Sequence, residues 1–321
     1  MINPKIAITM GDPAGIGPEI IIKAVNSINN FEKYLLIGNK EIFLETSRRL
    51  NQPLSEKLEI LDIPCDVSQI KTGKSSVESG RSSFLALEKA CRLAKDGEIR
   101  AIVTAPLSKK AINMAGYNYS GQTEVLQKYL EESGANAEML FVAGNFRVML
   151  LTRHVALENV PKSLNIEKIV DSLRSLDKFL RKDLKIKNPE IAVCGLNPHA
   201  GEDGILGQEE DKIIRPALDR LRHEFNIQAE GPFPADTLWI KAVKPYQDNI
   251  SQPYDCYVAC YHDQGLIPVK LLAMDSVVNT TINLSVIRTS PGHGTAYDIA
   301  GMNIANHKSM EEAIKLASSL S

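Results

Sequence analysis

The sequence predicts an α/β protein with two lobes, built on mainly parallel strands that helices cover on both faces. Short apolar runs alternate with longer stretches of helical spacing, which is typical of βαβ units. The chain has 321 residues, more than the ~100–200 residues of a typical single domain. Two apolar runs around Gly144-Asn145 interrupt the alternation and indicate an antiparallel hairpin in the second lobe.

The first half of the chain shows the alternation most clearly. The apolar runs that we expect to form strands are Lys5–Met10, Tyr34–Gly38, Leu58–Ile63 and Ala101–Thr104. The helices that we expect between and after them are Pro18–Val25, a helix capped by Asn39, Val77–Ala94 and a helix capped by Ser108. Because a helix follows each strand, the strands should run parallel in a sheet covered on both faces.

The second half adds the hairpin and further strands. The strands that we expect there are Met139–Ala143, Phe146–Leu151, Glu190–Cys194 and Cys256–Cys260. The helices that we expect there are one from Asn165 to Arg181 and a closing one at Met310–Leu320. We place the division so that one lobe comprises residues 1–120 and 290–321 and the other comprises residues 121–289.

The composition limits the possible classes of function. Lys and Arg number 37 against 39 Asp and Glu, for a net charge of -2, so a nucleic acid is not an expected partner. No apolar run approaches the ~18 residues of a membrane-spanning helix, so no membrane partner is expected either. The N-terminus shows no signal peptide, and the 5 cysteines include no CxxC pair, which favours reduced thiols and a cytoplasmic location.

Three histidines share one position relative to the predicted strands. His154, His199 and His262 each follow an apolar run by a few residues. In open α/β sheets, ligands bind beyond the carboxyl ends of the strands. Three imidazoles gathered there would bind a divalent metal ion and leave coordination positions for substrate oxygens. The alternative is that they are unrelated loop histidines.

Two glycine-rich segments would let the backbone approach a ligand closely. Gly11–Glu19 follows the first strand and opens a helix, where an anion-binding loop would lie, although its spacing matches neither common nucleotide-binding motif. Gly292–Gly301 precedes the closing helix. For both segments a purely structural turn is the alternative, and composition does not decide between the two.

Cationic and amide side chains follow His262 in the sequence. Lys270, Asn279 and Arg288 could hold a phosphorylated or carboxylated substrate, because arginine presents a fork of donors and lysine a point charge. The alternative is that they are solvated surface residues.

Together and in order, the motifs are specific. They are GDPAGIGPE at Gly11–Glu19, TAPLSK at Thr104–Lys109, NPHAGED at Asn197–Asp203, GPFPADT at Gly231–Thr237, YHDQGLIPVK at Tyr261–Lys270 and RTSPGHGTAYDIAG at Arg288–Gly301. On these motifs the chain resembles the 4-hydroxythreonine-4-phosphate dehydrogenase (PdxA) family along essentially its whole length. The resemblance implies a two-lobed α/β/α fold related to isocitrate and isopropylmalate dehydrogenases. One lobe would lie on the cofactor side, and the other would serve substrate, metal and dimerisation.

The resemblance also implies a reaction. It is the NAD-dependent oxidation and decarboxylation of 4-phosphooxy-L-threonine to 3-amino-2-oxopropyl phosphate, in the biosynthesis of pyridoxal 5'-phosphate (vitamin B6). His154, His199 and His262 would bind one divalent ion (Zn, Mg or Co) at the interface of a homodimer, with the third histidine coming from the partner subunit. The ion would favour the alkoxide of the substrate hydroxyl. The candidates for the general base are Asp263 and Asp236.

The C-terminal glycine-rich stretch resembles the adenosine-binding loop of isopropylmalate dehydrogenases. The cofactor-binding residues that this likeness implies are His293, Gly294, Thr295, Ala296 and Asp298. A carboxylate at position 298 would repel a 2′-phosphate, so we expect NAD in preference to NADP.

One substrate position departs from the family. The substrate contacts that the resemblance implies are Gln122, Thr123, Lys270, Asn279 and Arg288. At position 122 the family usually has histidine, and glutamine forms hydrogen bonds but carries no charge near neutral pH. The substrate could therefore be D-threonate or D-erythronate 4-phosphate, or an aromatic dihydrodiol, as in relatives of the same fold. A non-catalytic, metal-dependent binding protein for phosphorylated ligands and a metallohydrolase are the alternatives from other classes.

Overall fold

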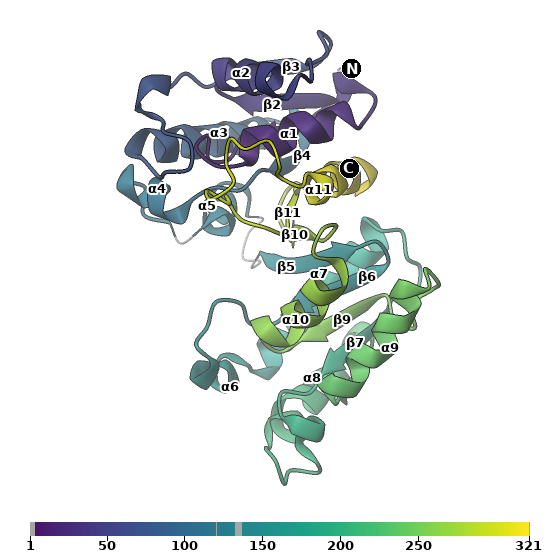
Figure 1. Ribbon diagram of the computed structural model, residues 1–321. Helices are drawn as coiled ribbons and strands as arrows, with labels where there is room; N and C mark the ends of the chain where they lie inside the picture. The colour runs from purple at the N-terminus through teal and green to yellow at the C-terminus, as the bar shows by residue number, and fades with distance from the viewer. Residues whose placement is uncertain (1–3, 120, 132–136, 321) are drawn as a thin grey trace. The chain divides into compact units, whose positions relative to one another are not determined.

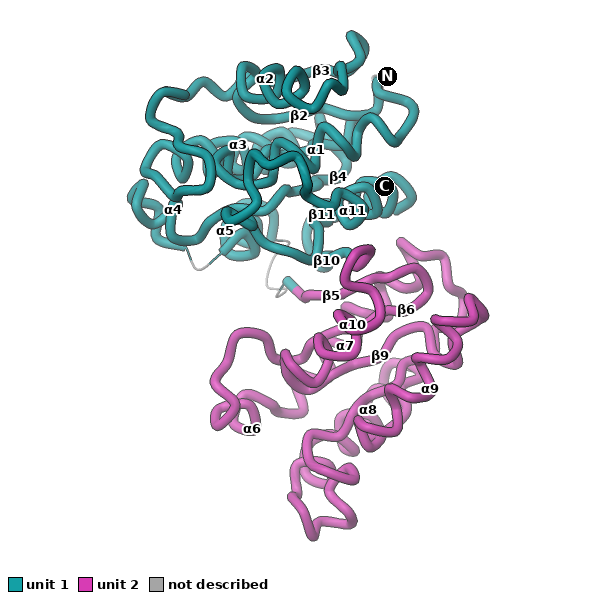
Figure 2. The backbone as a smooth tube through the Cα atoms, in the orientation of Figure 1, with its two compact units in different colours: residues 1–137, 278–321 teal, residues 138–277 magenta. Residues whose placement is uncertain are grey.

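The computed structural model describes residues 4–119, 121–131 and 137–320, and the chain divides into two compact units (Figure 1 and Figure 2). Unit 1 comprises Met1–Ala137 and Val278–Ser321, and unit 2 comprises Glu138–Val277. The sequence placed the division at residues 120 and 290. The structure instead keeps residues 122–130 and 278–289 in unit 1, because the first packs against a helix of that unit and the second begins a hairpin of its sheet.

Unit 1 is a twisted α/β layer structure whose strands lie in the order β3-β2-β1-β4-β11-β10. These strands are β1 (Lys5–Thr9), β2 (Tyr34–Gly38), β3 (Glu59–Asp62), β4 (Ile99–Thr104), β10 (Val278–Ile282) and β11 (Ile287–Pro291). All neighbouring pairs run parallel except β10 and β11. The apolar runs of the first half therefore form the parallel strands that their sequence predicts.

Helices cover both faces of this sheet. They are α1 (Gly17–Asn26), α2 (Lys40–Leu50), α3 (Val77–Lys95), α4 (Lys109–Met114), α5 (Gln122–Leu130) and α11 (Lys308–Leu320), with short 3-10 turns η1 (Phe31–Lys33) and η2 (Val67–Gln69). Successive side chains of β1 point to opposite faces. Ile6 and Ile8 enter the core that α1 and α11 cover, and Ala7 enters the core that α3 and α5 cover.

Unit 2 has strands in the order β5-β6-β9-β7-β8. They are β5 (Glu138–Ala143), β6 (Phe146–Leu150), β7 (Glu190–Cys194), β8 (Gln228–Phe233) and β9 (Cys256–Ala259). β5 and β6 form the predicted antiparallel hairpin, with Gly144 in the left-handed region at its turn. The pairs β6–β9, β9–β7 and β7–β8 are parallel.

The helical segments of unit 2 are α6 (Val160–Ser163), α7 (Ile166–Lys182), α8 (Arg215–Phe225), α9 (Ala235–Gln247) and α10 (His262–Ala273). Shorter segments are the 3-10 turns η3 (Leu157–Asn159) and η4 (Pro198–Gly201) and the π-helical turn η5 (Glu210–Ile214). The predicted α/β class with mainly parallel strands is confirmed. Within the described ranges, no helix combines the length and the apolar character needed to span a bilayer.

Candidate active site

The three histidines lie at one edge of the unit 2 sheet. β6, β9 and β7 are neighbouring parallel strands, so their carboxyl ends meet at the same edge. His154 follows β6, His199 lies in η4 after β7, and His262 begins α10 after β9. The structure thus places each of them beyond the end of a strand, as the sequence predicts.

Two of these histidines form a close pair. The ring centres of His154 and His262 are 5.6 Å apart. Two imidazoles bound to one tetrahedral ion, each at about 2 Å, place their ring centres about 5 Å apart. The pair therefore fits two ligands of a single divalent ion.

Carboxylates lie near Nδ1 of two of the imidazoles, and one of these two contacts is a hydrogen bond. Nδ1 of His262 lies 2.7 Å from Oδ1 of Asp263, and Nδ1 of His199 lies 3.5 Å from Oε2 of Glu202. A carboxylate at Nδ1 holds the ring in place and leaves Nε2 for a metal. Asp263 therefore has an orienting contact. The other predicted general base, Asp236, lies exposed in the first turn of α9.

The described residues of one chain do not form a complete metal site. Among residues 4–119, 121–131 and 137–320, no group of three His, Cys, Asp or Glu side chains is arranged to hold a metal ion. The described part of one chain thus supplies an adjacent imidazole pair and a third, exposed histidine on its own loop. The three-histidine site stays a prediction.

The loop that carries His199 has an unusual backbone. His199, Ala200, Glu202 and Asp203 all have positive φ values, between 44° and 54°. Residues other than glycine rarely adopt this left-handed backbone conformation. The strain that it causes must be offset by contacts with the surrounding structure. Runs of this kind cluster at ligand-binding sites.

Glu210, a residue that no sequence motif marks, provides that support. Its side chain is buried, with 1% exposed, on the π-helical turn η5. Oε1 accepts hydrogen bonds from the backbone N–H groups of Leu196 (2.8 Å) and Asn197 (2.7 Å), and Oε2 accepts one from Asn197 Nδ2 (2.9 Å). Glu210 lies just beyond the NPHAGED motif, so only the contact itself shows its role.

Gln264 joins two of the strand ends. Its Oε1 accepts a hydrogen bond from the backbone N–H of Cys260 (2.7 Å), and its Nε2 donates to the carbonyl of Gly195 (2.8 Å). The end of β9, which leads to His262, is thereby tied to the end of β7, which leads to His199. Gln264 lies inside the YHDQG motif, and this position is the one feature of the sequence that could have drawn attention to it.

Unit 1 contains a buried cation. Arg288 is 3% exposed and is the second residue of the polar strand β11. Its guanidinium donates to Thr104 Oγ1 from Nε (3.0 Å) and Nη2 (2.7 Å), to Thr281 Oγ1 from Nη1 (3.2 Å), and to Gln122 Oε1. No carboxylate of the described residues lies within ion-pair distance of it. Burial lowers the pKa of Arg288 to about 9, so the side chain remains cationic near pH 7.

The side-chain amide of Gln122 forms all its observed hydrogen bonds with other residues of this chain. Its Oε1 accepts from both Arg288 and the hydroxyl of Thr104, and its Nε2 donates to the carbonyl of Ala105 (3.1 Å). At this position the side chain acts as a neutral support for Arg288. Thr123 follows it in the first turn of α5 and is half-buried.

The other predicted substrate residues have different surroundings. Asn279, on β10, has a buried Oδ1 with no hydrogen-bond partner among the described residues. Such an atom lacks the pairing that buried polar groups need, and a ligand would supply it. Lys270 belongs to unit 2, where it lies exposed on α10 and makes no hydrogen bond or ion pair with another described residue.

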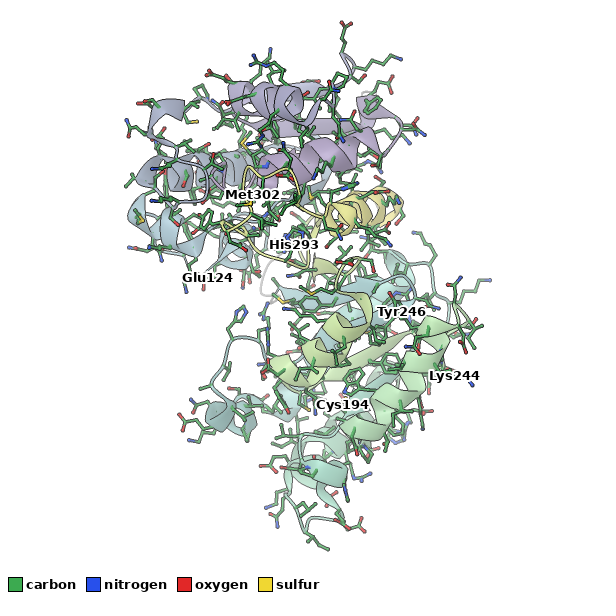
Figure 3. The ribbon with its side chains drawn as sticks, in the orientation of Figure 1. Glu124, Cys194, Lys244, Tyr246, His293 and Met302 are labelled. Atoms are coloured by element: carbon green, nitrogen blue, oxygen red, sulfur yellow. The ribbon has the colours of Figure 1, made fainter. Side chains whose placement is uncertain are left out.

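The predicted cofactor loop lies in unit 1, between β11 and α11, and Figure 3 labels His293 on it. Nδ1 of His293 lies 3.2 Å from the carbonyl of Gly294, so Nδ1–H donates and Nε2 is left as an acceptor. That Nε2 is buried and has no partner in the described part of the chain. Burial also lowers the pKa of His293, which keeps the ring neutral near pH 7. Asp298 is exposed.

The first glycine-rich segment packs against this loop. The backbone N–H of Ile16 donates to the carbonyl of Thr295 (3.0 Å). A Cβ on Gly15 would lie 2.8 Å from that same carbonyl oxygen, and Gly11, with φ +70°, leaves only 2.3 Å to the carbonyl oxygen of Pro106. These close backbone approaches favour the structural interpretation of Gly11–Glu19.

Each unit therefore carries a separate set of functional groups. Unit 2 has histidines at the ends of parallel strands, and unit 1 has a buried arginine and a glycine-rich loop with an unsatisfied imidazole nitrogen. The fold defines a two-unit α/β protein, and the groups in its two units are of the kinds that enzyme sites use.

The comparisons with known proteins agree with that class. The family described as "Pyridoxal phosphate biosynthetic protein PdxA" matches residues 15–317. The 4-hydroxythreonine-4-phosphate dehydrogenases of Nostoc sp. and Synechocystis sp. are 42% and 41% identical, and each alignment covers 99% of this chain and 93% and 95% of theirs. The crystal structure of the Klebsiella pneumoniae 4-hydroxythreonine-4-phosphate dehydrogenase has a TM-score of 0.85 at 34% identity, with 99% of both chains covered. The chain belongs to the PdxA family.

A second kind of relative shares the fold at lower similarity. The terephthalate 1,2-cis-dihydrodiol dehydrogenase of Burkholderia xenovorans matches with a TM-score of 0.67 at 28% identity, over 98% of both chains. The family resemblance predicted from the motifs is thus confirmed, and its members and neighbours include dehydrogenases of more than one substrate.

Proposed function

We propose that this protein is the dehydrogenase that oxidises 4-phosphooxy-L-threonine with NAD and decarboxylates it to 3-amino-2-oxopropyl phosphate, in the synthesis of pyridoxal 5'-phosphate. The family and the relatives' names support a dehydrogenase of this pathway. The single observation that carries the substrate class is Arg288, a buried cation whose hydrogen bonds all go to uncharged oxygens.

A buried charge without a counter-charge is costly to the folded protein. An anionic substrate group would supply that counter-charge, and arginine matches the geometry of phosphate and carboxylate oxygens. Asn279, with its unsatisfied buried Oδ1, would accept a hydrogen bond from a donor group of the same substrate. Lys270, which has no hydrogen-bond or ion-pair partner among the described residues, would add a point charge.

The contacts of Gln122 support the same substrate. Its amide is hydrogen-bonded within the protein at both ends, so the change from histidine to glutamine leaves the support of Arg288 in place. We therefore interpret Gln122 as a substitution that keeps a neutral hydrogen bond, and the family's phosphorylated substrate remains the first expectation.

The residues proposed to hold the metal are His154, His199 and His262. The spacing of His154 and His262 and the carboxylates at Nδ1 of His199 and His262 are what support this assignment. A bound divalent ion would supply Lewis-acid stabilisation of negative charge on substrate oxygen, through Zn, Mg or Co. Asp263 would hold the His262 ring in its binding orientation, and Asp236 is the remaining candidate to accept the hydroxyl proton.

We propose NAD as the hydride acceptor, bound by His293, Gly294, Thr295, Ala296 and Asp298. The buried acceptor nitrogen of His293 supports a ligand donor at that position. The exposed carboxylate of Asp298 favours a ribose hydroxyl over a 2′-phosphate, so NAD should give the higher kcat/KM than NADP.

We also propose a homodimer that completes the metal site. Ile267 and Leu271 on α10 and Met274, the residue that caps its C-terminus, are 58%, 81% and 50% exposed, and their spacings of 4 and 3 residues place them on one helix face. Exposed apolar stripes of this kind mark protein contacts. L271E should shift the sedimentation coefficient to that of a monomer, whereas V77E, at an exposed apolar residue of unit 1, should not.

The test is NADH formation at 340 nm by the metal-loaded protein. 4-Phosphooxy-L-threonine, D-threonate 4-phosphate and D-erythronate 4-phosphate are compared as substrates, with a terephthalate dihydrodiol as the unphosphorylated competitor. A clear kcat/KM preference for 4-phosphooxy-L-threonine supports the proposal. Preference for a sugar-acid phosphate would assign the chain to a catabolic branch of the family. Preference for the dihydrodiol would mean that the protein does not recognise a phosphate group.

Two further outcomes would reject a dehydrogenase. Binding of the phosphorylated compounds with no binding of NAD or NADP would favour a non-catalytic binding protein. Release of inorganic phosphate without NADH would favour a metallohydrolase.

A further inference from the structure

Tyr297 anchors the glycine-rich loop of unit 1 from within. This loop, Gly292–Gly301, contains no helix or strand beyond the end of β11, and Ala296 in it has φ 42°. A non-glycine residue in that region is strained, and surrounding contacts must hold it. The neighbouring Tyr297 supplies such a contact, because its hydroxyl reaches a fully buried carboxylate, Asp12.

The geometry around Asp12 is specific. The hydroxyl of Tyr297 donates to Oδ2 of Asp12 at 2.6 Å, and the backbone N–H of Ala14 donates to Oδ1 at 2.9 Å. The hydroxyls of Ser79 and Ser75 add longer bonds, to Asp12 Oδ2 (3.4 Å) and to the Tyr297 oxygen (3.2 Å). Asp12 is 0% exposed, and burial raises its pKa while these hydrogen bonds lower it. Burial also raises the pKa of Tyr297 to about 12, so the phenol keeps its proton.

The backbone around this hydrogen bond allows few alternatives. A Cβ on Gly73 would lie 2.9 Å from the carbonyl oxygen of Tyr297, and a Cβ on Gly15 would lie 2.8 Å from that of Thr295. The N–H of Ile16 also donates to Thr295. The loop is therefore held by backbone contacts on either side of one strong side-chain hydrogen bond.

We propose that Asp12 and Tyr297 are positioning residues for the cofactor, because their hydrogen bond holds the loop His293–Asp298 in the conformation that binds NAD. This inference rests on the proposed function. A loop that is held in its binding conformation before the ligand arrives avoids the ordering penalty of binding. When the hydrogen bond is lost, only a fraction of molecules present the competent loop, and the apparent affinity for NAD falls by that fraction.

The test compares two tyrosine variants by direct binding. Y297F removes the hydroxyl that contacts Asp12. Y34F is the matched control, because the Tyr34 hydroxyl is also part-buried in unit 1 and bonds Ser318 Oγ at 3.1 Å, away from the loop. Titration calorimetry with NAD should show a Kd raised about tenfold in Y297F, the order of one lost hydrogen bond to a charged group. Y34F should bind NAD as tightly as the unmodified protein does, and its change in Tm should be comparable to that of Y297F.

A double-variant cycle isolates the bond. If Asp12 and Tyr297 act through one hydrogen bond, NAD binds to D12N/Y297F no more weakly than to the weaker single variant. The affinity for the metal alone, measured in the same way, should stay within error in all four proteins. This readout separates a positioned loop from a general loss of structure.

The outcomes distinguish the two proposals. If the unmodified protein binds no NAD or NADP, the proposed function and this inference both fail. If it binds NAD and Y297F binds equally well, only the positioning role is wrong. Equal weakening by Y297F and Y34F also overturns it, since the effect would then reflect stability rather than the loop.

Discussion

Arg288 donates four hydrogen bonds, and each goes to an uncharged oxygen: two to Thr104, one to Thr281 and one to Gln122. Such an arrangement fixes the plane of the guanidinium before any ligand arrives, and it leaves the positive charge unneutralised. A lysine could not reproduce it, because an ammonium is a point charge on a flexible stem and has no fork.

We therefore expect R288K to raise the KM for the phosphorylated substrate by at least about tenfold, the value of one lost charge-assisted hydrogen bond. The KM for NAD should change little. Initial-rate kinetics measure both. The control is R147K, which alters a half-buried arginine that donates to the carbonyl of Asp255 at 3.1 Å in unit 2. Equal effects of R288K on both KM values would contradict a substrate role.

Glu210 acts on His199 through the loop between them. Its carboxylate holds the N–H groups of Leu196 and Asn197, so it sets the start of the left-handed run that carries His199. Outer partners of metal ligands typically contribute about 10–100-fold in metal affinity.

We expect E210A to weaken Zn binding by about 10–100-fold, because the loop loses the acceptor that positions His199. Competition with a chelator of known affinity measures this. The control is D211A, which removes the neighbouring exposed partner of Arg215. Unchanged metal affinity in a folded E210A protein would show that His199 does not need this loop conformation, or does not bind the metal.

At the scale of single residues, the sequence predicted which side chains follow strands, and it could not predict their partners. The histidines were visible because apolar runs precede them. The contacts of Gln122 and Glu210 were not, because they depend on residues far along the chain, such as Arg288, or on a turn that no motif marks.

Helix α3 contains a glycine at a position where most other residues would ordinarily stabilise a helix more. Gly80 lies in its first turns, and a Cβ there would be 1.9 Å from the carbonyl oxygen of Ala111 in α4. The two helices therefore approach backbone to backbone. α4 directly follows Thr104–Ser108, so this contact also locates the segment that supports Arg288.

In an exposed helix, replacing glycine by alanine stabilises by about 1 kcal/mol. We expect the opposite sign for G80A, a loss of about 2 kcal/mol, because the added methyl group has no space and forces the helices apart. Urea unfolding followed by circular dichroism measures the free energy. R81A, at the exposed neighbouring position, should change it by less than about 0.5 kcal/mol. A stabilised G80A would mean that α3 and α4 can separate without penalty.

Strands were predictable to the extent that they are apolar. Lys5–Thr9 and Glu190–Cys194 each contain three consecutive buried aliphatic residues, and the sequence located both strands. β8, β10 and β11 were not located, because their sequences (QAEGPF, VNTTI and IRTSP) show no apolar run. The polar side chains of β11 are buried because hydrogen bonds satisfy them. Thr289 Oγ1, for example, donates to the carbonyl of Ala313 at 2.8 Å. The displacement of the second lobe boundary, from residue 290 to residue 278, follows from the polar strands β10 and β11.

In the whole molecule, the two sets of functional groups belong to different units. The proposed metal ligands all lie in Glu138–Val277, and the proposed cofactor loop lies in Val278–Ser321. Each ligand should therefore order the backbone of its own unit first.

Hydrogen exchange followed by mass spectrometry tests this division. We expect Zn alone to slow exchange in residues 196–204 and 260–265, where the histidine loops lie. NAD alone should slow it in residues 12–17 and 292–301, the paired glycine-rich segments. Each ligand serves as the control for the other, and protection by Zn confined to unit 1 would contradict the assignment of the histidines.

The place of β11 in its sheet has a consequence during translation. It lies between β4 and β10, so the two halves of unit 1 meet only when residues 287–291 leave the ribosome. At ~5–20 residues per second, synthesis of residues 105–286 takes about 10–40 s. During that time β4 presents an unpaired apolar edge, which is a site for aggregation or chaperone binding. Unit 2 is one continuous segment and can fold within the same interval. A chain that ends at Val277 and has been released from the ribosome should therefore be cut by protease within residues 4–119 and resist cutting within residues 138–277, so the part made first matures last.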